Sequence, residues 1–248
     1  MTLAPLYASL DRAEFAAAVA PSIPSIPSIP HYLETVYWWA YVHPRAVHLF
    51  ERVWLVNAIL FGNYSRLRDT ALAELGTPVE GRTLQVACVY GNLTPRLCLR
   101  LKPEARLDIV DILPIQLQNL ARKLAPDERV ALLHGDSSSL ACPDARYDQV
   151  LLFFLLHEQP EAVRRGTLAE AMRVVKPGGR IVIVDYHQPS RWHPMRALMR
   201  LVFSRLEPYA MDLWRKGVED FLPPDRTPAA LRKKTFFGGL YQMLVLTR

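Results

Sequence analysis

The feature of this sequence that most constrains its fold is a series of short apolar runs that alternate with helical stretches from residue 82 onward. Several of these runs are apolar on both faces, which is typical of strands buried in a parallel sheet. Between them, leucines recur at helical spacing, as at Leu117, Leu120 and Leu124. This alternation predicts right-handed βαβ crossovers and a doubly wound, mostly parallel α/β sheet. The predicted strands are 83–90, 107–112, 130–134, 149–156 and 180–186.

The rest of the chain divides around this region. Residues 1–30 form a flexible segment that ends in a Pro-Ser-Ile repeat, where regular prolines exclude helix and sheet ladders. Residues 31–78 are rich in Tyr and Trp at helical spacing and predict an aromatic-rich helical extension that covers the sheet edge. Residues 79–248 form the α/β domain, with a basic helical insertion at 190–234. The tail at 235–247 predicts two more strands around Gly238, which brings the sheet to seven.

Composition narrows the class of protein. Half of the residues are apolar and 22% are charged, which excludes a disordered chain. Three cysteines without metal-ligand spacing (Cys88, Cys98 and Cys142) argue against a disulfide scaffold and indicate a reducing compartment. The first residues lack the basic start of a secretory signal, and no apolar run approaches the length of a membrane span. We therefore expect a soluble intracellular protein.

The net charge of +6 lies entirely in residues 186–248, because the acidic and basic residues before this segment balance. Such a segment suits nucleic acid, an anionic membrane or an acidic substrate. In residues 190–207, arginines recur among apolar residues, as expected either of an interfacial helix on acidic lipid headgroups or of a core-facing helix with solvated arginines. Nucleic acid is disfavoured, because the chain contains no nucleic-acid-binding module.

Acceptor groups stand at the ends of three consecutive predicted strands. The loop after the first strand runs through Ala87 and Gly91, and Asp111 and Asp136 follow the next two strands. In doubly wound sheets ligands bind at this edge, where a carboxylate can accept both ribose hydroxyls of an adenosine group. Asp136 is in place to accept from an adenine amino group. The alternative is that each acid is a solvated cap at a strand end.

Residues 82–186 resemble class I S-adenosylmethionine (SAM)-dependent methyltransferases, which have a Rossmann-like fold, and are most similar to the branch that methylates quinones and phospholipids. The loop departs from the glycine-rich pattern of that family, since Gln85 replaces its acid and Ala87 and Val89 replace glycines. The bulkier residues crowd the amino-acid end of the cofactor. The predicted cofactor-binding residues are Gln85, Ala87, Val89, Tyr90, Gly91, Asn92, Asp111 and Asp136.

The altered loop, the Leu156–Pro160 and Asp185–His187 stretches, and the tail from Phe236 to Gln242 resemble the rhodoquinone-biosynthesis proteins, which are methyltransferase-like. The resemblance covers nearly the whole chain. It implies conversion of ubiquinone to rhodoquinone, in which SAM donates an amino group that replaces a ring methoxy and Mn²⁺ assists. Two alternatives stay open: a conventional SAM-dependent methyltransferase acting on a lipophilic quinol or phenol, and a non-catalytic protein that binds cofactor and quinone.

The chemistry implied by this resemblance would be helped by a Lewis acid on the quinone carbonyl and by exclusion of water. His157, Glu158, Asp185 and His187 follow the fourth and fifth strands and form a mixed N/O set that suits Mn²⁺. Each also has a structural alternative, as a strand cap, a first-turn acid or an ion-pair partner. The predicted catalytic residues are Tyr90, His157 and His187.

The aromatic extension also has two interpretations, since aromatic residues at helical spacing either form a core or cover a flat, lipophilic ligand. The predicted substrate contacts are Tyr37, Trp38, Tyr41 and Trp54. A bilayer-dissolved quinone and the basic segment together predict a cytoplasmic protein on the inner membrane, in peripheral contact with anionic lipid. The sequence leaves the oligomeric state open.

Overall fold

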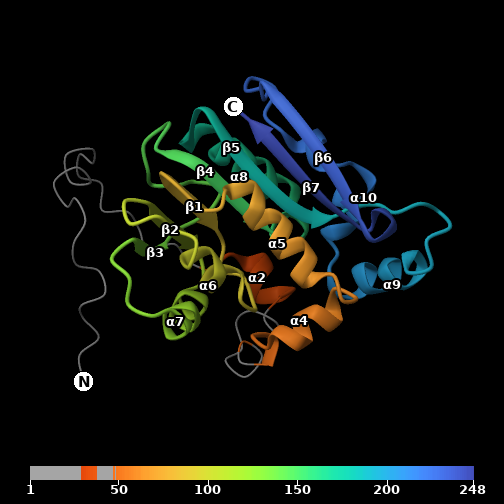
Figure 1. Ribbon diagram of the computed structural model, residues 1–248. Helices are drawn as coiled ribbons and strands as arrows, with labels where there is room; N and C mark the ends of the chain where they lie inside the picture. The colour runs from red at the N-terminus through yellow and green to blue at the C-terminus, as the bar shows by residue number, and fades with distance from the viewer. Residues whose placement is uncertain (1–28, 38–46, 48) are drawn as a thin grey trace.

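The computed structural model describes residues 29–37, 47 and 49–248. These residues form a seven-stranded sheet in the order β3-β2-β1-β4-β5-β7-β6, with helices on both faces (Figure 1). The first five strands are parallel neighbours, and β7 runs antiparallel between β5 and β6. The predicted seven-stranded, mostly parallel α/β sheet is therefore confirmed. The strands are β1 (Arg82–Val86), β2 (Arg106–Asp111), β3 (Val130–His134), β4 (Tyr147–Phe153), β5 (Val175–Tyr186), β6 (Ala230–Phe236) and β7 (Tyr241–Thr247).

The core has two layers because the central strands are apolar on both faces. Val150 and Leu152 of β4 pack in one layer, whereas Leu151 and Phe153 pack in the other. The first layer includes α8, and the second includes α5, α6 and α9. The predicted helical N-terminal region is present as α2, α4 and α5. The helices are α2 (His31–Thr35), α4 (Val53–Ile59), α5 (Tyr64–Leu75), α6 (Leu93–Cys98), α7 (Pro114–Lys123), α8 (Glu161–Val174), α9 (Arg196–Leu206) and α10 (Ala210–Arg215).

The segment predicted as a helical insertion, 190–234, contains α9, α10 and one turn of 3₁₀ helix, η3 (Val218–Phe221), but β6 begins within it. β6 starts at Ala230, and its residues stay exposed until Phe236. This strand lies at the sheet edge, so it lacks the buried apolar alternation that would mark it in the sequence. Lys233 and Lys234 fall on this edge, where lysines discourage pairing with another sheet.

The strand order reverses between β1 and β4, which creates the switch point where doubly wound folds bind ligands. Residues of α2, α4 and α9 wall a cavity over the carboxyl ends of the strands here. Within the described part of the chain, no helix has the length and apolar character needed to cross a bilayer.

Candidate functional site

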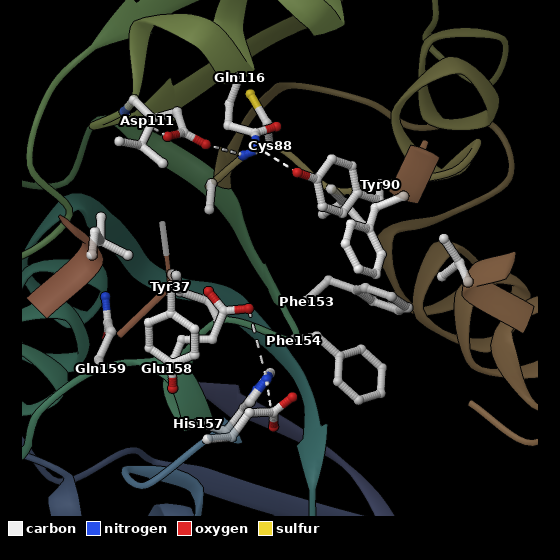
Figure 2. A pocket seen from close by; sticks show the side chains of 18 of the residues that line it. Tyr37, Cys88, Tyr90, Asp111, Gln116, Phe153, Phe154, His157, Glu158 and Gln159 are labelled. Atoms are coloured by element: carbon white, nitrogen blue, oxygen red, sulfur yellow. Dashed lines mark hydrogen bonds and ion pairs between the residues drawn. The ribbon is translucent and has the colours of Figure 1, made fainter. Parts of the chain in front are cut away.

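A cavity of about 490 Å³ lies at the carboxyl ends of β1 to β5. Asp111 and Tyr90 lie toward one side of it, His157 and Glu158 lie toward the other, and Phe153 lies between them (Figure 2). One wall therefore lies at the switch point and carries Asp111 and Tyr90. The opposite wall follows β4 and carries His157 and Glu158. The described N-terminal helices and α9 complete the enclosure with mainly apolar side chains.

The loop after β1 is held from beneath by Gln85. This side chain is fully buried, its amide donates to the Ala87 carbonyl at 3.0 Å, and the Thr94 hydroxyl donates to its Oε1 at 3.0 Å. Gln85 thus ties the loop to α6 and does not line the cavity, whereas Ala87 and Val89 do. Ala87 has a φ of +70°, in the left-handed region that glycine adopts without strain.

The second half of the loop is fixed by residues from outside the β1–α6 unit. Gly91 has a φ of +83°, and a Cβ there would approach the Tyr64 hydroxyl to 2.6 Å. That hydroxyl accepts from the Asn92 amide at 2.9 Å. The Gly91 amide donates to Glu51 Oε1 at 3.0 Å, and Lys123 Nζ donates to the same oxygen at 2.6 Å. A carboxylate from the N-terminal region therefore holds the loop in which the sequence lacks its expected acid.

Tyr90 lines the cavity from this loop. Its hydroxyl accepts from the Gln116 amide at 2.8 Å, and its ring stacks on Phe50 with centroids 6.0 Å apart. Burial raises the pKa of Tyr90 far above its usual value, partly opposed by the hydrogen bond from Gln116. Tyr90 therefore stays a neutral phenol at any physiological pH.

Asp111 and Asp136 both line the cavity. Asp111 accepts from the Cys88 amide at 2.7 Å and from the Leu113 amide at 2.8 Å, one bond to each oxygen. Burial raises the pKa of Asp111, against the lowering effect of these two bonds. Asp136 accepts from the amide and the hydroxyl of Ser138 through Oδ1. Each carboxylate keeps lone pairs for a ligand, because an ionised carboxylate has about four acceptor positions.

On the opposite wall, His157 is surrounded by carboxylates. Its Nδ1 lies 2.8 Å from Asp185 Oδ1, and its Nε2 lies 3.7 Å from both Glu158 Oε1 and Glu207 Oε2. Burial lowers the pKa of His157, but Asp185, through its charge and hydrogen bond, and then Glu207 and Glu158 outweigh this and raise it to about 9. At neutral pH His157 is therefore an imidazolium whose Nε2–H faces the cavity. Burial raises the pKa of Glu207, while His157 lowers it.

The turn that carries this histidine, η2 (Leu156–Glu158), is held by Arg164 of α8. This side chain is fully buried and donates to the carbonyls of Leu156 at 2.7 Å and of Gln159 and Tyr209 at 2.8 Å each. Its guanidinium also lies over the ring of Phe221 at 4.6 Å. Arg164 thereby joins the η2 turn to the segment that follows Glu207.

His157 lies close to Asp185 and Glu158, but the four predicted metal ligands do not form a coordination site. Asp185 is fully buried, and its two oxygens accept from three backbone amides and from His157. His187 Nδ1 lies 2.7 Å from the Gly239 carbonyl, and His187 does not line the cavity. Among the described residues, no group of three or more His, Cys, Asp or Glu side chains is arranged to hold a metal ion. The structure therefore does not fit the Mn²⁺ site predicted from the sequence.

Only one of the predicted substrate contacts that the structure describes lines the cavity. Tyr37 is buried and lines the cavity, whereas Trp54 is 63% exposed and does not line it. Trp38 and Tyr41 lie outside the described residues. The structure adds an aromatic wall that was not predicted, formed at the ends of β4 and β5 by Phe153, Phe154 and Tyr186, with the Phe153 and Phe154 ring centroids 5.1 Å apart.

Glu207 was also not predicted from the sequence as a residue of the site. It follows an arginine-rich apolar helix, and a single acid at a helix end carries no pattern that distinguishes it from a solvated residue. The one available signal is that residues 186–206 contain no other acidic residue.

Comparison with known proteins agrees with this geometry. A family model described as a methyltransferase domain matches residues 83–179. A demethylmenaquinone methyltransferase of Staphylococcus aureus is 28% identical over 167 residues, which cover 67% of this chain and 68% of that protein.

Two solved structures share the fold. Human N-acetylserotonin methyltransferase in complex with SAM superposes with a TM-score of 0.61 at 15% identity, covering 89% of this chain and 60% of that one. The N-methyltransferase NodS from Bradyrhizobium japonicum, in complex with S-adenosyl-L-homocysteine, has a TM-score of 0.59 at 12% identity, covering 88% of this chain and 98% of that one. The chain therefore has the fold of class I SAM-dependent methyltransferases, and its residues 83–179 match a methyltransferase domain.

Proposed function

We propose that this protein is a SAM-dependent transferase that acts on a lipophilic quinone. The observation that carries the proposal is that one cavity joins strand-end carboxylates to an aromatic wall and a buried imidazolium. In the proposed arrangement, Asp111 accepts the ribose hydroxyls, Asp136 accepts from the adenine amino group, and the methionyl end follows the loop through Val89. The quinone ring then lies against Phe153 and Phe154, facing His157.

The reaction that we propose is replacement of a ring methoxy of ubiquinone by an amino group, which yields rhodoquinone. SAM would supply this group: its amino nitrogen would bond to the ring carbon, and the methoxy would leave with a proton as methanol. The nitrogen–Cα bond would then break with transfer of a β-proton to nitrogen, which would leave the remainder of SAM with a Cα–Cβ double bond. The crowded loop supports this choice over methyl transfer, because Ala87, Val89 and Tyr90 stand where the family has room for the amino-acid end of SAM.

The chain's own residues suit this chemistry. The charged His157 donates through Nε2 to the quinone carbonyl and so draws electron density from the ring carbon that is attacked. Glu158 and Glu207 lie 3.7 Å from that nitrogen and accept the protons that the amine loses. Asp185 holds the imidazole by Nδ1 and keeps it charged. His157 thus performs the polarising role that the sequence predicts for a metal.

The proposal includes no step through Mn²⁺. Asp185 is fully used by hydrogen bonds, and His187 turns toward Gly239. We also propose peripheral contact with an anionic membrane on the cytoplasmic side of the inner membrane, since a polyprenyl quinone is dissolved in the bilayer.

A conventional quinol methyltransferase is the second candidate, supported by the relative from Staphylococcus aureus, which by its name methylates demethylmenaquinone. A non-catalytic protein that binds cofactor and quinone is the third.

One experiment separates the three candidates. Purified protein is incubated with SAM and a short-chain ubiquinone under three conditions: without added metal, with Mn²⁺, and with a chelator. The products are identified by mass spectrometry. We expect an amino-substituted quinone and methanol, and the chelator should not change the yield. S-adenosylhomocysteine with a methylated product would assign the protein to the second candidate. Cofactor binding without turnover under every condition would assign it to the third.

A further inference from the structure

Exposed apolar side chains are concentrated at one place on the molecule. Among the described residues, ten large apolar side chains are exposed, and eight of them fall in residues 49–59 and 192–206. We call these eight the rim residues: Leu49, Val53, Trp54, Ile59, Trp192, Leu198, Leu201 and Leu206. The other two, Leu99 and Leu231, lie on other elements. Single exposed apolar residues are ordinary, but a cluster on two adjoining elements marks an interaction surface.

The two segments border the mouth of the cavity. Val56 and Ile59 of α4 line it, as do Val202 and Leu206 of α9. Ile59 is 44% exposed and Leu206 is 46% exposed, so each reaches both the cavity and the solvent. The cavity therefore opens between α4 and α9, which lie at the same end of the molecule (Figure 1).

α9 has apolar side chains on opposite sides. Met199 and Phe203 are buried in the core. Leu198 and Leu201 are spaced by three residues and share a stripe of the exposed side with Arg205. A helix that packs only against a core would carry polar residues at these positions.

The exposed charged side chains within residues 49–59 and 191–206 are all basic. Arg52, Arg191, Arg200 and Arg205 are exposed, and none of them forms an ion pair with a described residue. No acidic residue occurs between 191 and 206. Elsewhere in the described chain basic side chains are commonly paired, as Arg232 is with Glu74. A second copy of this chain fits this surface poorly, because a symmetric interface would bring unpaired arginines face to face.

We propose that the rim residues and these four arginines form a docking surface for an anionic lipid bilayer, and that quinone passes from the bilayer into the cavity between α4 and α9. The arginines contact headgroup phosphates, while Trp54, Trp192 and the leucines enter the boundary of the acyl region. The entry route rests on the proposed function. The docking itself does not, because it follows from the surface alone.

The test is co-sedimentation of the full chain with phosphatidylcholine vesicles, with and without phosphatidylglycerol. We expect binding only with the anionic lipid, weakening as salt is raised. Leu201→Glu should reduce the partition coefficient at least tenfold, whereas Leu99→Glu, at an even more exposed leucine, should not change it. Arg200→Gln and Arg205→Gln should each reduce it about fivefold. The matched control is Arg122→Gln on α7.

Tryptophan fluorescence gives a second measurement. Brominated lipids should quench emission that is lost in the Trp54→Phe, Trp192→Phe variant, while the buried Trp214 should stay unquenched. Absence of binding to anionic vesicles, or equal binding by the Leu201→Glu and Leu99→Glu proteins, would overturn the inference. A dimer in solution that Leu201→Glu dissociates would assign the surface to a second copy instead. Turnover of a short-chain quinone in lipid-free buffer is measured in parallel, so that loss of docking and failure of the proposed function are distinguished.

Discussion

Replacing Asp185 with asparagine should discharge His157, because Asp185 is the main group that raises the pKa of this histidine against the effect of burial. In the wild-type protein that pKa is about 9, compared with 6.5 for an unperturbed histidine. Without the carboxylate, only Glu207 and Glu158 oppose the effect of burial, so the pKa of His157 should fall toward its unperturbed value of 6.5. At pH 7 a pKa of 6.5 would leave about a quarter of His157 protonated, so the protonated fraction should fall about fourfold.

The same replacement should cost about 3–5 kcal/mol of unfolding free energy, the usual effect of breaking a buried ion pair from one side. The folded-state pKa of His157 is raised, so the stabilisation from its charge is complete below about pH 6.5 and disappears as the pH rises through about 9. The difference between wild type and Asp185→Asn should thus narrow above pH 9. It should not vanish, because the variant also loses an acceptor for the amides of Leu156 and Tyr186.

The assay is a pH titration of histidine ring nitrogens by NMR, with the His157 signal assigned by its loss in His157→Gln, together with urea unfolding across the same pH range. Glu161→Gln is the control, since Glu161 lies on the surface and its ion pairs with Arg165 and Lys216 are exposed. This variant should leave both measurements unchanged. A wild-type His157 that titrates at or below pH 6.5, or one unaffected by Asp185→Asn, would refute the reasoning.

Two further replacements test how the site is held together. Ala87→Gly should raise the unfolding free energy by about 1 kcal/mol, because Ala87 has a φ of +70°. As a control, Ala71→Gly within α5 should lower the unfolding free energy by about as much. Thermal unfolding measures both, and a stability loss in Ala87→Gly would contradict the strain argument. Arg164→Met should lower the unfolding free energy, measured in urea, by about 3 kcal/mol or more, because three carbonyls, two of them in buried hydrogen bonds, lose their donor. A neutral result would show that Arg164 does not hold the η2 turn.

The sheet was predictable because its signal is local: each central strand is a short apolar run, and each run is followed by a helical pattern. β6 was missed over 230–234 because an edge strand with exposed Arg232 and Lys233 has no such pattern. Asp111 and Asp136 were predictable for a related reason, since parallel strands bring their carboxyl ends to one edge.

The environment of His157 was not predictable. Its neighbour Glu207 is 50 residues away in sequence, and the two are brought together because α10 packs against both the η2 turn and α9. The predicted metal ligands, by contrast, come in two pairs that are each close in sequence, but they do not form a site. Asp185 and His187 are two residues apart, a spacing that within a strand places both side chains on one face, but β5 ends at Tyr186 and hydrogen bonds at the strand end decide which groups are available. Asp185 is used by the backbone, and His187 turns away to Gly239.

The Glu51 carboxylate couples the conformation of the N-terminal region to that of the loop after β1. It accepts from the Gly91 amide and from Lys123, and the neighbouring Phe50 stacks on Tyr90. A quinone that displaces residues 49–51 at the cavity mouth must therefore also alter the loop after β1, on which SAM is proposed to bind. By thermodynamic reciprocity, each ligand then changes the affinity of the other by the same factor. The two ligands of this cavity are thus expected to bind cooperatively rather than independently, with Glu51 as the residue whose replacement by glutamine weakens that coupling.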